Sequence, residues 1–400
     1  MDSRMTLEDV DVSGKRVLVR VDYNVPFAPN STDISDDSRI VASLDTVRYL
    51  IERECRIVLC SHVGRPKGRV VDELRVRPIA SRLSELLDMP VAVAPDCIGP
   101  EAASAVDGLD PGGVALLENL RFHSEEEAND VAFAQELASI VDLFVNDAFG
   151  AAHRAHASTE GITHFLPAVS GFLMARELKM LGRVLDEPGR PLIAVLGGAK
   201  ASDKMAALRN LVSKADTLIV GGGMAATFLL AEGLEVGDSL VEEDKIPMAR
   251  EIVKTARRAG VDLLLPSDVV VADAFSDDAV NRVVRVDAIP AGWRIMDIGP
   301  STTDTFATAL EAAGTVVWNG PMGVSEWKSF SKGTAVMAET LANLVDATTV
   351  IGGGSTAEAV ATFGFAHAMT HVSTGGGASL EFLEGKTLPG VDALMPVINQ

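Results

Sequence analysis

The chain has 400 residues, 47% of them hydrophobic and 23% charged, a size and composition that predict a globular protein with two domains. Its 56 acidic and 35 basic residues give a net charge of −21, which argues against nucleic acid and anionic membranes as partners. The N-terminus shows no apolar secretory segment, no apolar run is long enough to span a membrane, and the cysteines form no C-x-x-C pair, so we expect a cytoplasmic protein.

The acidic balance also bears on the working environment. Arginine outnumbers lysine among the basic residues. Acidic, lysine-poor surfaces suit concentrated salt, where ions screen the repulsion between like charges. We therefore predict a halophile-like surface; the alternative is an ordinary acidic enzyme.

Short apolar runs alternate with helical patterns along the first half of the chain. Residues 38–54 and 77–88 carry apolar side chains at the period of an amphipathic helix. Continuous apolar strands that alternate with such helices predict a parallel sheet covered on both faces. The strands are expected at residues 16–25, 56–63, 91–96, 114–120 and 143–149.

One long amphipathic helix is predicted within residues 170–191, and the alternation then resumes. The sequence thus predicts two open, mainly parallel, doubly wound (Rossmann-like) α/β domains joined by a helical hinge. The strands of the second half are expected at residues 191–198, 217–224, 262–273, 294–299, 315–321, 348–354 and 371–377.

The two halves differ in the residues that follow their strands. In open α/β sheets, ligands bind at the carboxyl ends of the strands. Arginine forks there suit phosphate and carboxylate, whereas glycine turns that open onto helix N-termini suit the phosphates of a nucleotide. The first half has polar strand ends: Asp22, Asn24, His62, Arg65, Arg121, His123, Asn146 and Asp147, with Arg39 and Arg154 nearby. The second half has glycines: Gly197, Gly198, Gly221–Gly223, Gly352–Gly354 and Gly375–Gly377.

Lys200 and Lys204 follow the first glycine turn of the second half. If this segment is helical, their spacing places both ammonium groups on one face, where they would neutralise a phosphate in transit. The alternative is an ordinary exposed helix face. The acidic run 125–127 is expected to be a solvated face.

Two glycine segments, beginning at Gly221 and at Gly352, also match the loose G-x-G-x-x-A dinucleotide pattern. A dehydrogenase needs an acidic residue at a strand end about 20 positions further on. The acidic residues at 242–244 lie instead at a polar helix start. A dehydrogenase is therefore the weaker alternative, and NAD binding would distinguish it.

Nine segments of the chain together resemble the phosphoglycerate kinase family, and they occur in the family's order from residue 20 onward. They are RVDYNVP, SHVGRPKG, LLENLRFH, VNDAFGAAHRAHAS, GFLMARELKML, LGGAKASDKM, VGGGMAATFL, WNGPMGVSEW and HVSTGGGASLEFLEGKTLPGVDAL.

The resemblance implies a hinge-bending enzyme of two domains. Residues 1–172, with a tail from about 385 to 400, would bind 3-phosphoglycerate, residues 186–384 would bind the nucleotide, and residues 171–186 would form the hinge helix. The activity implied is reversible transfer of the acyl phosphate of 1,3-bisphosphoglycerate to MgADP, giving ATP and 3-phosphoglycerate in glycolysis or gluconeogenesis. A monomer is the family's usual state and our expectation. The other alternative is a non-catalytic phosphate-ligand binding protein on the same scaffold.

The resemblance also implies site residues, motif by motif. The substrate-binding set is Asp22, Asn24, Arg39, His62, Arg65, Arg121 and Arg154. The nucleotide-binding set is Gly197, Gly198, Lys204, Gly221, Gly222, Asn319, Pro321, Glu326, Gly353, Gly354, Ser355 and Thr356. The catalytic set is Arg39, Lys200, Lys204, Gly353 and Gly376, with Lys200 and Arg39 at the transferring phosphoryl group from opposite domains.

Ser355 departs from the family pattern, which usually has Asp after the three glycines. In the family this Asp helps to hold the Mg²⁺ of the nucleotide. A hydroxyl at this position can hold a metal-bound water, or it can cap the helix. We therefore expect Ser355 to be a weak metal contact, with Mg²⁺ held chiefly by phosphate oxygens and water.

Overall fold

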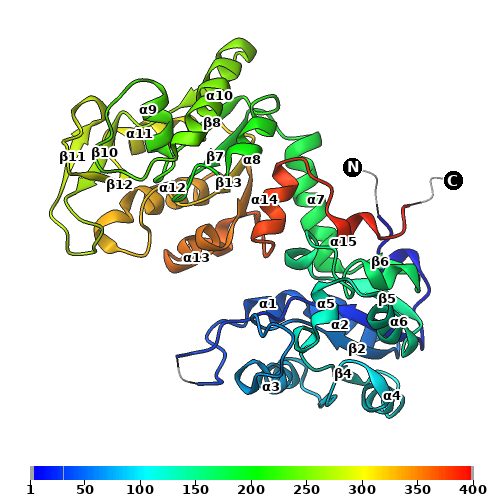
Figure 1. Ribbon diagram of the computed structural model, residues 1–400. Coiled ribbons are helices and arrows are strands. Elements are labelled where there is room, and N and C mark those ends of the chain that lie inside the picture. Colours follow the sequence, from blue (N-terminus) through cyan, green and yellow to red (C-terminus); the bar gives the residue numbers. More distant parts are fainter. Residues whose placement is uncertain (1–3, 30, 398–400) are drawn as a thin grey trace. The chain divides into compact units, whose positions relative to one another are not determined.

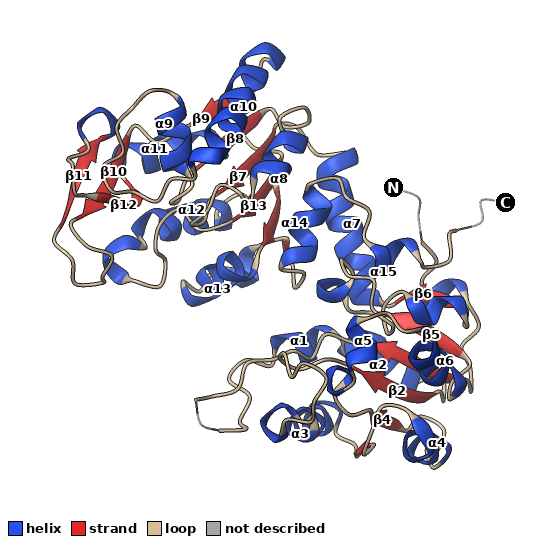
Figure 2. Ribbon diagram, in the orientation of Figure 1, coloured by secondary structure: helices blue, strands red, loops and turns tan. Residues whose placement is uncertain are grey.

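The computed structural model describes residues 4–29 and 31–397 and divides the chain into two compact units. The first unit extends to Lys179 and takes up the chain again from Thr387, and the second unit is Met180–Lys386. Figure 1 colours the chain by residue number and Figure 2 distinguishes its helices and strands. Each unit contains a six-stranded parallel sheet, which confirms the predicted fold class.

The sheet of the first unit has the strand order β3-β4-β2-β1-β5-β6. All five strand pairs are parallel, so the carboxyl ends of the strands meet at one edge of the sheet. The order reverses between β1 and β5, the kind of position where α/β proteins bind ligands. The strands are β1 (Arg16–Arg20), β2 (Arg56–Cys60), β3 (Val91–Val93), β4 (Val114–Leu116), β5 (Leu143–Asn146) and β6 (Ala168–Ser170).

Helices cover both faces of this sheet because alternate residues of each strand point to opposite sides. Val17 and Val19 pack in one core with α2 and α3, whereas Leu18 packs in the other core with α4 and α6. The helix predicted at 38–54 is divided at Ser43 into α1 and α2. The helices of the first unit are α1 (Ser38–Ala42), α2 (Leu44–Ile51), α3 (Arg77–Leu87), α4 (Gly99–Asp107), α5 (Ser124–Glu127), α6 (Val131–Ser139) and α15 (Pro389–Asp392), and the 3-10 helices are η1 (Leu7–Asp9), η2 (Asp72–Leu74), η3 (Leu120–Phe122), η4 (Phe149–Ala151) and η5 (Gly161–His164).

A single helix, α7 (Phe172–Asp186), occupies the segment where one long helix is predicted. Asp147 stabilises its N-terminus, because the Oδ1 atom of Asp147 accepts a hydrogen bond of 3.1 Å from the Met174 amide. The boundary between the two units falls between Lys179 and Met180, within this helix. None of the described helices is long and apolar enough to cross a membrane.

The second unit contains the other parallel sheet, in the order β15-β14-β13-β7-β8-β9. From β7 the chain builds outward to β8 and β9 on one side, and β13, β14 and β15 lie on the other, so the order reverses between β7 and β13. The strands are β7 (Leu192–Leu196), β8 (Thr217–Val220), β9 (Asp262–Leu264), β13 (Thr315–Asn319), β14 (Thr348–Gly352) and β15 (His371–Val372).

A separate antiparallel sheet, β11-β10-β12, was not predicted from the sequence. The single strand expected at 262–273 is wrong, because β9 and β10 lie in different sheets on either side of Pro266. Proline has no amide hydrogen for a strand ladder, and it ends the first run there. The strands are β10 (Asp268–Ala272), β11 (Asn281–Arg285) and β12 (Arg294–Ile298).

The helices of the second unit pack on its parallel sheet and beside the small one (Figure 2). One large core joins Trp318, which is fully buried, to residues of α11, α12 and α13. The helices are α8 (Met205–Leu211), α9 (Ala225–Ala231), α10 (Ile246–Ala259), α11 (Pro300–Glu311), α12 (Lys332–Ala342), α13 (Gly354–Thr362) and α14 (Gly377–Leu383), and the 3-10 helices are η6 (Glu243–Lys245), η7 (Val286–Ala288), η8 (Lys328–Phe330) and η9 (Ala366–Ala368).

Candidate functional site

In the first unit, Arg39 and Asp22 form an ion pair at the carboxyl end of β1. Arg39 is the second residue of α1, and its guanidinium donates a hydrogen bond to the Oδ2 atom of Asp22, which is buried. One third of the Arg39 side chain remains exposed (33%). The structure thus brings together two predicted site residues that lie 17 positions apart, with a guanidinium accessible to an anion.

His62 follows β2 and is held by an arginine that the sequence analysis missed. The Nη2 atom of Arg20 lies 3.0 Å from the Nδ1 atom of His62, and the Arg20 Nε donates a hydrogen bond of 2.9 Å to Ser158. Burial lowers the pKa of His62 well below its ordinary value, and the charges of Arg20 and Arg121 lower it further. His62 is therefore a neutral ring at pH 7. Arg20 is the last residue of the apolar strand β1. The sequence analysis extended this strand to residue 25, and it therefore did not place Arg20 at a strand end.

Gly64 connects two other predicted residues through its backbone. The Gly64 amide donates a hydrogen bond of 2.8 Å to the Oδ1 atom of Asn24, and Arg121 donates one of 2.9 Å to the Gly64 carbonyl. Burial lowers the pKa of Arg121, although its Nε lies 3.2 Å from a carboxylate oxygen of Glu127. Arg65 and Arg154 are exposed, and Arg154 donates to the ring of its neighbour His153.

The expectation that residues 125–127 form a solvated face is wrong for Glu126. This carboxylate is fully buried and accepts hydrogen bonds from the hydroxyl and the amide of Ser158, at 2.6 and 2.9 Å. It also lies 3.7 Å from the Nδ1 atom of His156. Glu126 is therefore a buried counter-charge beneath the basic residues, and its neighbours Glu125 and Glu127 misled the sequence interpretation.

Two of the polar residues at strand ends in the first unit, Asn146 and Asp147, stabilise the fold through buried hydrogen bonds. The Asn146 side-chain amide donates a hydrogen bond of 2.9 Å to the Gly390 carbonyl, and Asp147 receives the amide of Met174. Both side chains are fully buried. The C-terminal segment and α7 therefore contact the carboxyl end of β5. Arg154 follows this strand, whereas the other predicted basic residues, Arg39, His62, Arg65 and Arg121, follow β1, β2 and β4.

His156 gives a prediction for acid stability. Burial, followed by the charges of Arg121 and Arg20, lowers the pKa of His156 to about 4. In the unfolded chain, the His156 imidazole binds a proton below about pH 6.5, whereas in the folded protein it binds one only below about pH 4. This histidine therefore contributes stability above pH 6.5 that is lost as the pH falls toward 4.

We expect His156→Gln to reduce the loss of unfolding free energy between pH 7 and pH 4.5 by about 2 kcal/mol. Urea unfolding at the two pH values measures this difference. The buried Asp147, whose pKa is raised to about 6, changes stability in the opposite direction, but it is present in both proteins and cancels in the comparison. Equal pH dependence of the two proteins would contradict the assignment.

In the second unit, the predicted nucleotide residues converge where the strand order reverses. The Lys204 ammonium donates a hydrogen bond to the Oδ1 atom of Asn319, the last residue of β13. The nearest atoms to a Cβ built at Gly353 belong to the Asn319 side chain, at 3.0 Å. Lys204, Asn319 and the turn before α13 therefore lie together, at the carboxyl ends of neighbouring strands β13 and β14.

The lysines do not share a helix face as expected. Residues 201–204 form a turn, and α8 begins only at Met205, with Lys204 at its N-cap position. Lys200 is exposed, whereas burial lowers the pKa of Lys204. The half-buried ammonium makes Lys204 the stronger candidate for binding phosphate, because an anion would stabilise its charge.

Backbone geometry at two glycines explains why these turns need glycine. Gly353 is the N-cap of α13 and has φ of +86°, a conformation that side chains rarely adopt. Gly222 has φ of +65°, and a Cβ there would lie 2.5 Å from the Gly198 amide nitrogen. The turns after β7 and β8 therefore pack directly against each other, and the predicted residues Gly197, Gly198, Gly221 and Gly222 form one cluster.

The remaining predicted residues lie on three segments of the second unit: α13, the start of α14 and the loop after β13. Thr356 is buried, and its hydroxyl accepts a hydrogen bond of 2.7 Å from the Gly320 amide, next to Pro321. Gly376 is the N-cap of α14. Gly354, at the first position of α13, is exposed, as is Glu326 in the loop after β13.

Ser355 does not cap α13. Gly353 holds the N-cap position, and Ser355 is the exposed second residue of the helix. Its hydroxyl is a neutral oxygen donor of the type that suits Mg²⁺ through a bound water. Mg²⁺ commonly keeps several waters and binds chiefly to substrate phosphates, so the residues present fit an ion that the nucleotide carries.

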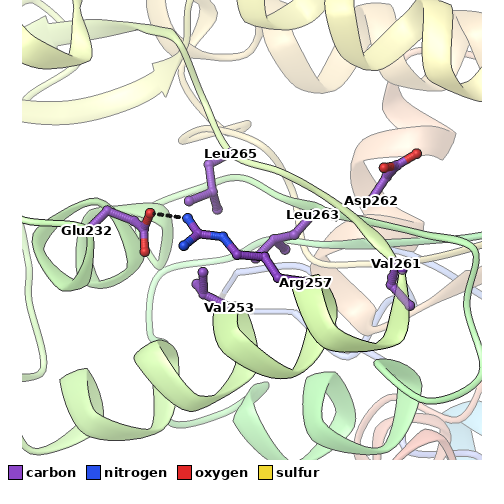
Figure 3. A pocket seen from close by; sticks show the side chains of 8 residues that line it. Glu232, Val253, Arg257, Val261, Asp262, Leu263 and Leu265 are labelled. Atoms are coloured by element: carbon purple, nitrogen blue, oxygen red, sulfur yellow. Dashed lines mark hydrogen bonds and ion pairs between the residues drawn. The ribbon is translucent and has the colours of Figure 1, made fainter.

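A pocket of about 430 Å³ in the second unit lies away from this cluster (Figure 3). It is lined by residues of the edge strand β9 and of α10, and Arg257 on its wall pairs with Glu232 at 2.8 Å. Strand β9 is separated from β7 by β8. The pocket is therefore not the site where the glycine turns and Lys204 meet.

A family model described as phosphoglycerate kinase matches residues 7–386. The phosphoglycerate kinase of Moorella thermoacetica is 55% identical over 392 residues, which cover 98% of this chain and 99% of that protein. The phosphoglycerate kinase of Pelotomaculum thermopropionicum is 56% identical over 393 residues, with coverage of 98% and 99%.

Solved structures agree with these relatives. The structure of phosphoglycerate kinase from Coxiella burnetii has a TM-score of 0.88 and 40% sequence identity, and the match covers 98% of each chain. The crystal structure of phosphoglycerate kinase from Pyrococcus horikoshii has a TM-score of 0.84 and 34% identity, again over 98% of each chain.

Proposed function

The chain belongs to the phosphoglycerate kinase family, and on that premise we propose a role in the reaction for each of its two units. The activity is a reversible phosphoryl transfer between 1,3-bisphosphoglycerate and ADP, which gives 3-phosphoglycerate and ATP. The first unit binds the glycerate substrate through its basic cluster, which consists of Arg39, His62, Arg65, Arg121 and Arg154. The second unit binds the nucleotide at the turns after β7, β13 and β14.

The meeting of Lys204, Asn319 and the turn at Gly353 is the observation that carries this proposal. The N-terminus of α13 directs free backbone amides and the positive end of the helix dipole toward a bound anion. A half-buried ammonium beside these amides suits the terminal phosphates of a nucleotide. In the first unit, Arg39 is paired but still accessible, so it can bind an anionic substrate without losing Asp22.

The reaction needs no general base from the protein. Its two acceptors are the terminal phosphate of ADP and the carboxylate of 3-phosphoglycerate, and both are already ionised at pH 7. Catalysis then depends on positioning and on neutralising the charge of the transferring phosphoryl group. Arg39, Lys200 and Lys204 supply that positive charge.

Mg²⁺ enters as part of the nucleotide complex. When bound, it neutralises charge on the phosphate oxygens. Ser355 would contact it through water, because its exposed hydroxyl lies in the first turn of α13. The protein is expected in the cytoplasm and as a monomer.

A coupled assay of ADP release from MgATP and 3-phosphoglycerate tests the proposed function. Turnover that requires both substrates supports the kinase. Folded protein that binds nucleotide but shows no turnover at any Mg²⁺ concentration would favour a binding protein instead.

The same assay in dilute and in multimolar KCl, with the coupling enzymes checked in each salt, tests the halophile-like surface. Equal activity and equal thermal stability in both salts would reject it.

Ser355→Asp should lower the Mg²⁺ concentration for half-maximal rate about fivefold. Two unit charges about 4 Å apart in water interact by about 1 kcal/mol, and this value applies to a carboxylate that faces a Mg²⁺ ion whose charge the nucleotide phosphates partly neutralise. Ser355→Asn, which has the size of Asp without its charge, is the matched control and should leave the requirement unchanged. A Mg²⁺ dependence that is the same in all three proteins would contradict a metal-linked role for position 355.

A further inference from the structure

We propose that Asp96, Cys97 and His123 form a zinc-binding site in the first unit. Asp96 and Cys97 lie in the loop between β3 and α4, and His123 directly follows η3. Across residues 4–29 and 31–397, these three form the one group in which at least three carboxylate, thiol or imidazole ligand atoms all lie within 4.8 Å of one another. The group lies outside the predicted substrate-binding residues.

The three ligand types are those that zinc prefers. Zinc binds thiolate sulfur at about 2.3 Å and imidazole nitrogen or carboxylate oxygen at about 2.0–2.2 Å, so tetrahedral ligands lie roughly 3.3–3.7 Å apart. The His123 Nε2 atom is now 2.7 Å from the Asp96 Oδ1 atom. Binding would require these two atoms to separate by roughly 0.6 Å or more, with the ion replacing the proton between them. The Cys97 sulfur lies within 4.8 Å of both atoms, and it would have to lie within roughly 3.7 Å of each in the bound state.

The surroundings of Cys97 favour a cation. Cys97 is fully buried, and its thiol lies in the field of two carboxylates, those of Asp96 and Glu126. The same negative charges would attract a divalent ion. On binding, the thiol loses its proton to the solvent and the sulfur becomes a thiolate ligand.

The other two ligands provide access. The His123 and Asp96 side chains are 27% and 42% exposed, so an ion can enter from their side. Water would supply the fourth ligand, as it does where a zinc ion has three protein ligands. The site is therefore a surface-accessible one with a single buried thiol at its base.

A histidine–carboxylate pair can also exist without any metal, and this chain contains one for comparison. The His164 Nε2 atom lies 2.8 Å from the Glu160 Oε1 atom, nearly the geometry of the His123–Asp96 pair. No thiol joins that pair among the described residues. His164 thus provides a control in which the ion pair is present and the third ligand is absent.

Zinc at this site would tie together two segments of the first unit. One is the loop before α4, and the other follows η3, which contains the candidate substrate residue Arg121. Because the ion would bind the folded chain with all three ligands, it should raise the apparent melting temperature. This inference does not depend on the kinase assignment, so it can be tested without turnover.

The test uses the full chain after reduction and treatment with a chelator. Zn²⁺ is titrated in competition with a chromophoric chelator, and Co²⁺ serves as the spectroscopic substitute. We expect one equivalent of metal, a higher melting temperature with Zn²⁺, and a thiolate-to-cobalt charge-transfer band in the near ultraviolet. Cys97→Ser and His123→Gln should each weaken Zn²⁺ binding at least tenfold and abolish the temperature shift, and Cys97→Ser should also abolish the band.

Two matched variants complete the design. Cys55→Ser changes another buried thiol, and His164→Gln removes the control pair; both should bind Zn²⁺ as the unmodified protein does. If circular dichroism shows that Cys97→Ser does not fold, His123→Gln decides the result alone. The proposal is overturned if no cobalt–thiolate band forms, or if a folded Cys97→Ser or His123→Gln protein binds Zn²⁺ as tightly as the unmodified chain.

Discussion

Replacing Arg39 by Ala should lower kcat about 10³-fold while the protein remains folded. Arginine contacts to a transferring phosphoryl group contribute about 10³ or more to the rate in related chemistry, because the guanidinium neutralises charge that develops in the transition state. Arg39 combines a buried acidic partner, Asp22, with an exposed third of its own surface. Steady-state kinetics with 3-phosphoglycerate and MgATP measure the loss.

Three further variants separate catalysis from structure. Arg39→Lys keeps the charge but loses the planar fork, so it should recover only part of the rate. Arg16→Ala removes another guanidinium paired with an aspartate, Asp142 at 2.9 Å, but at the amino end of β1, and it should leave kcat unchanged. Combining Arg39→Ala with Asp22→Asn removes the unpaired buried carboxylate as well. A kcat within tenfold of the unmodified enzyme in Arg39→Ala would remove this residue from the catalytic set.

The sequence predicted the parts of the fold that depend on local patterns. Alternate residues of apolar strands fill the two cores of the first unit, and the helix periodicity correctly indicated which faces are buried. The small antiparallel sheet was missed because β11 has mostly exposed side chains and therefore shows little apolar pattern. The division of residues 262–273 between two sheets depends on tertiary pairing, which periodicity does not encode.

The candidate site shows the same division between local and tertiary information. Glycine turns are visible in sequence because the backbone itself requires them, as the positive φ of Gly353 and the close approach at Gly222 demonstrate. Burial of a charge is not visible. Arg20 lies in an apolar strand and Glu126 in an acidic run, yet both are buried, and they interact through Ser158. A buried carboxylate, that of Glu126, therefore lies beneath the basic cluster, and only the fold reveals it.

The second prediction with a large expected effect concerns Lys204. Its partial burial has opposite consequences for the stability of the free protein and for nucleotide binding. Burial lowers its pKa, so the charged ammonium is disfavoured in the free protein. Its partner, the Oδ1 atom of Asn319, is neutral and offsets this cost only in part. A bound phosphate would supply the missing negative charge. The ammonium is thus unfavourable for the stability of the free protein and favourable for nucleotide binding, the pattern expected of a functional residue.

Lys204→Met should therefore lower kcat/KM for MgATP about 10²- to 10³-fold, as loss of one preorganised donor does elsewhere, without lowering the melting temperature of the free protein. Methionine retains the apolar stem of the side chain, so packing is preserved and only the charge is lost. Thermal unfolding without and with MgADP measures the stability of the free protein and the binding of nucleotide, because a ligand raises the melting temperature only when it binds the folded state. We expect the nucleotide-dependent shift to be lost in Lys204→Met and retained in Lys254→Met, where the lysine is exposed on α10. A Lys204→Met protein that is less stable when free, yet shifts normally with MgADP, would make Lys204 a structural residue and direct attention to the exposed Lys200.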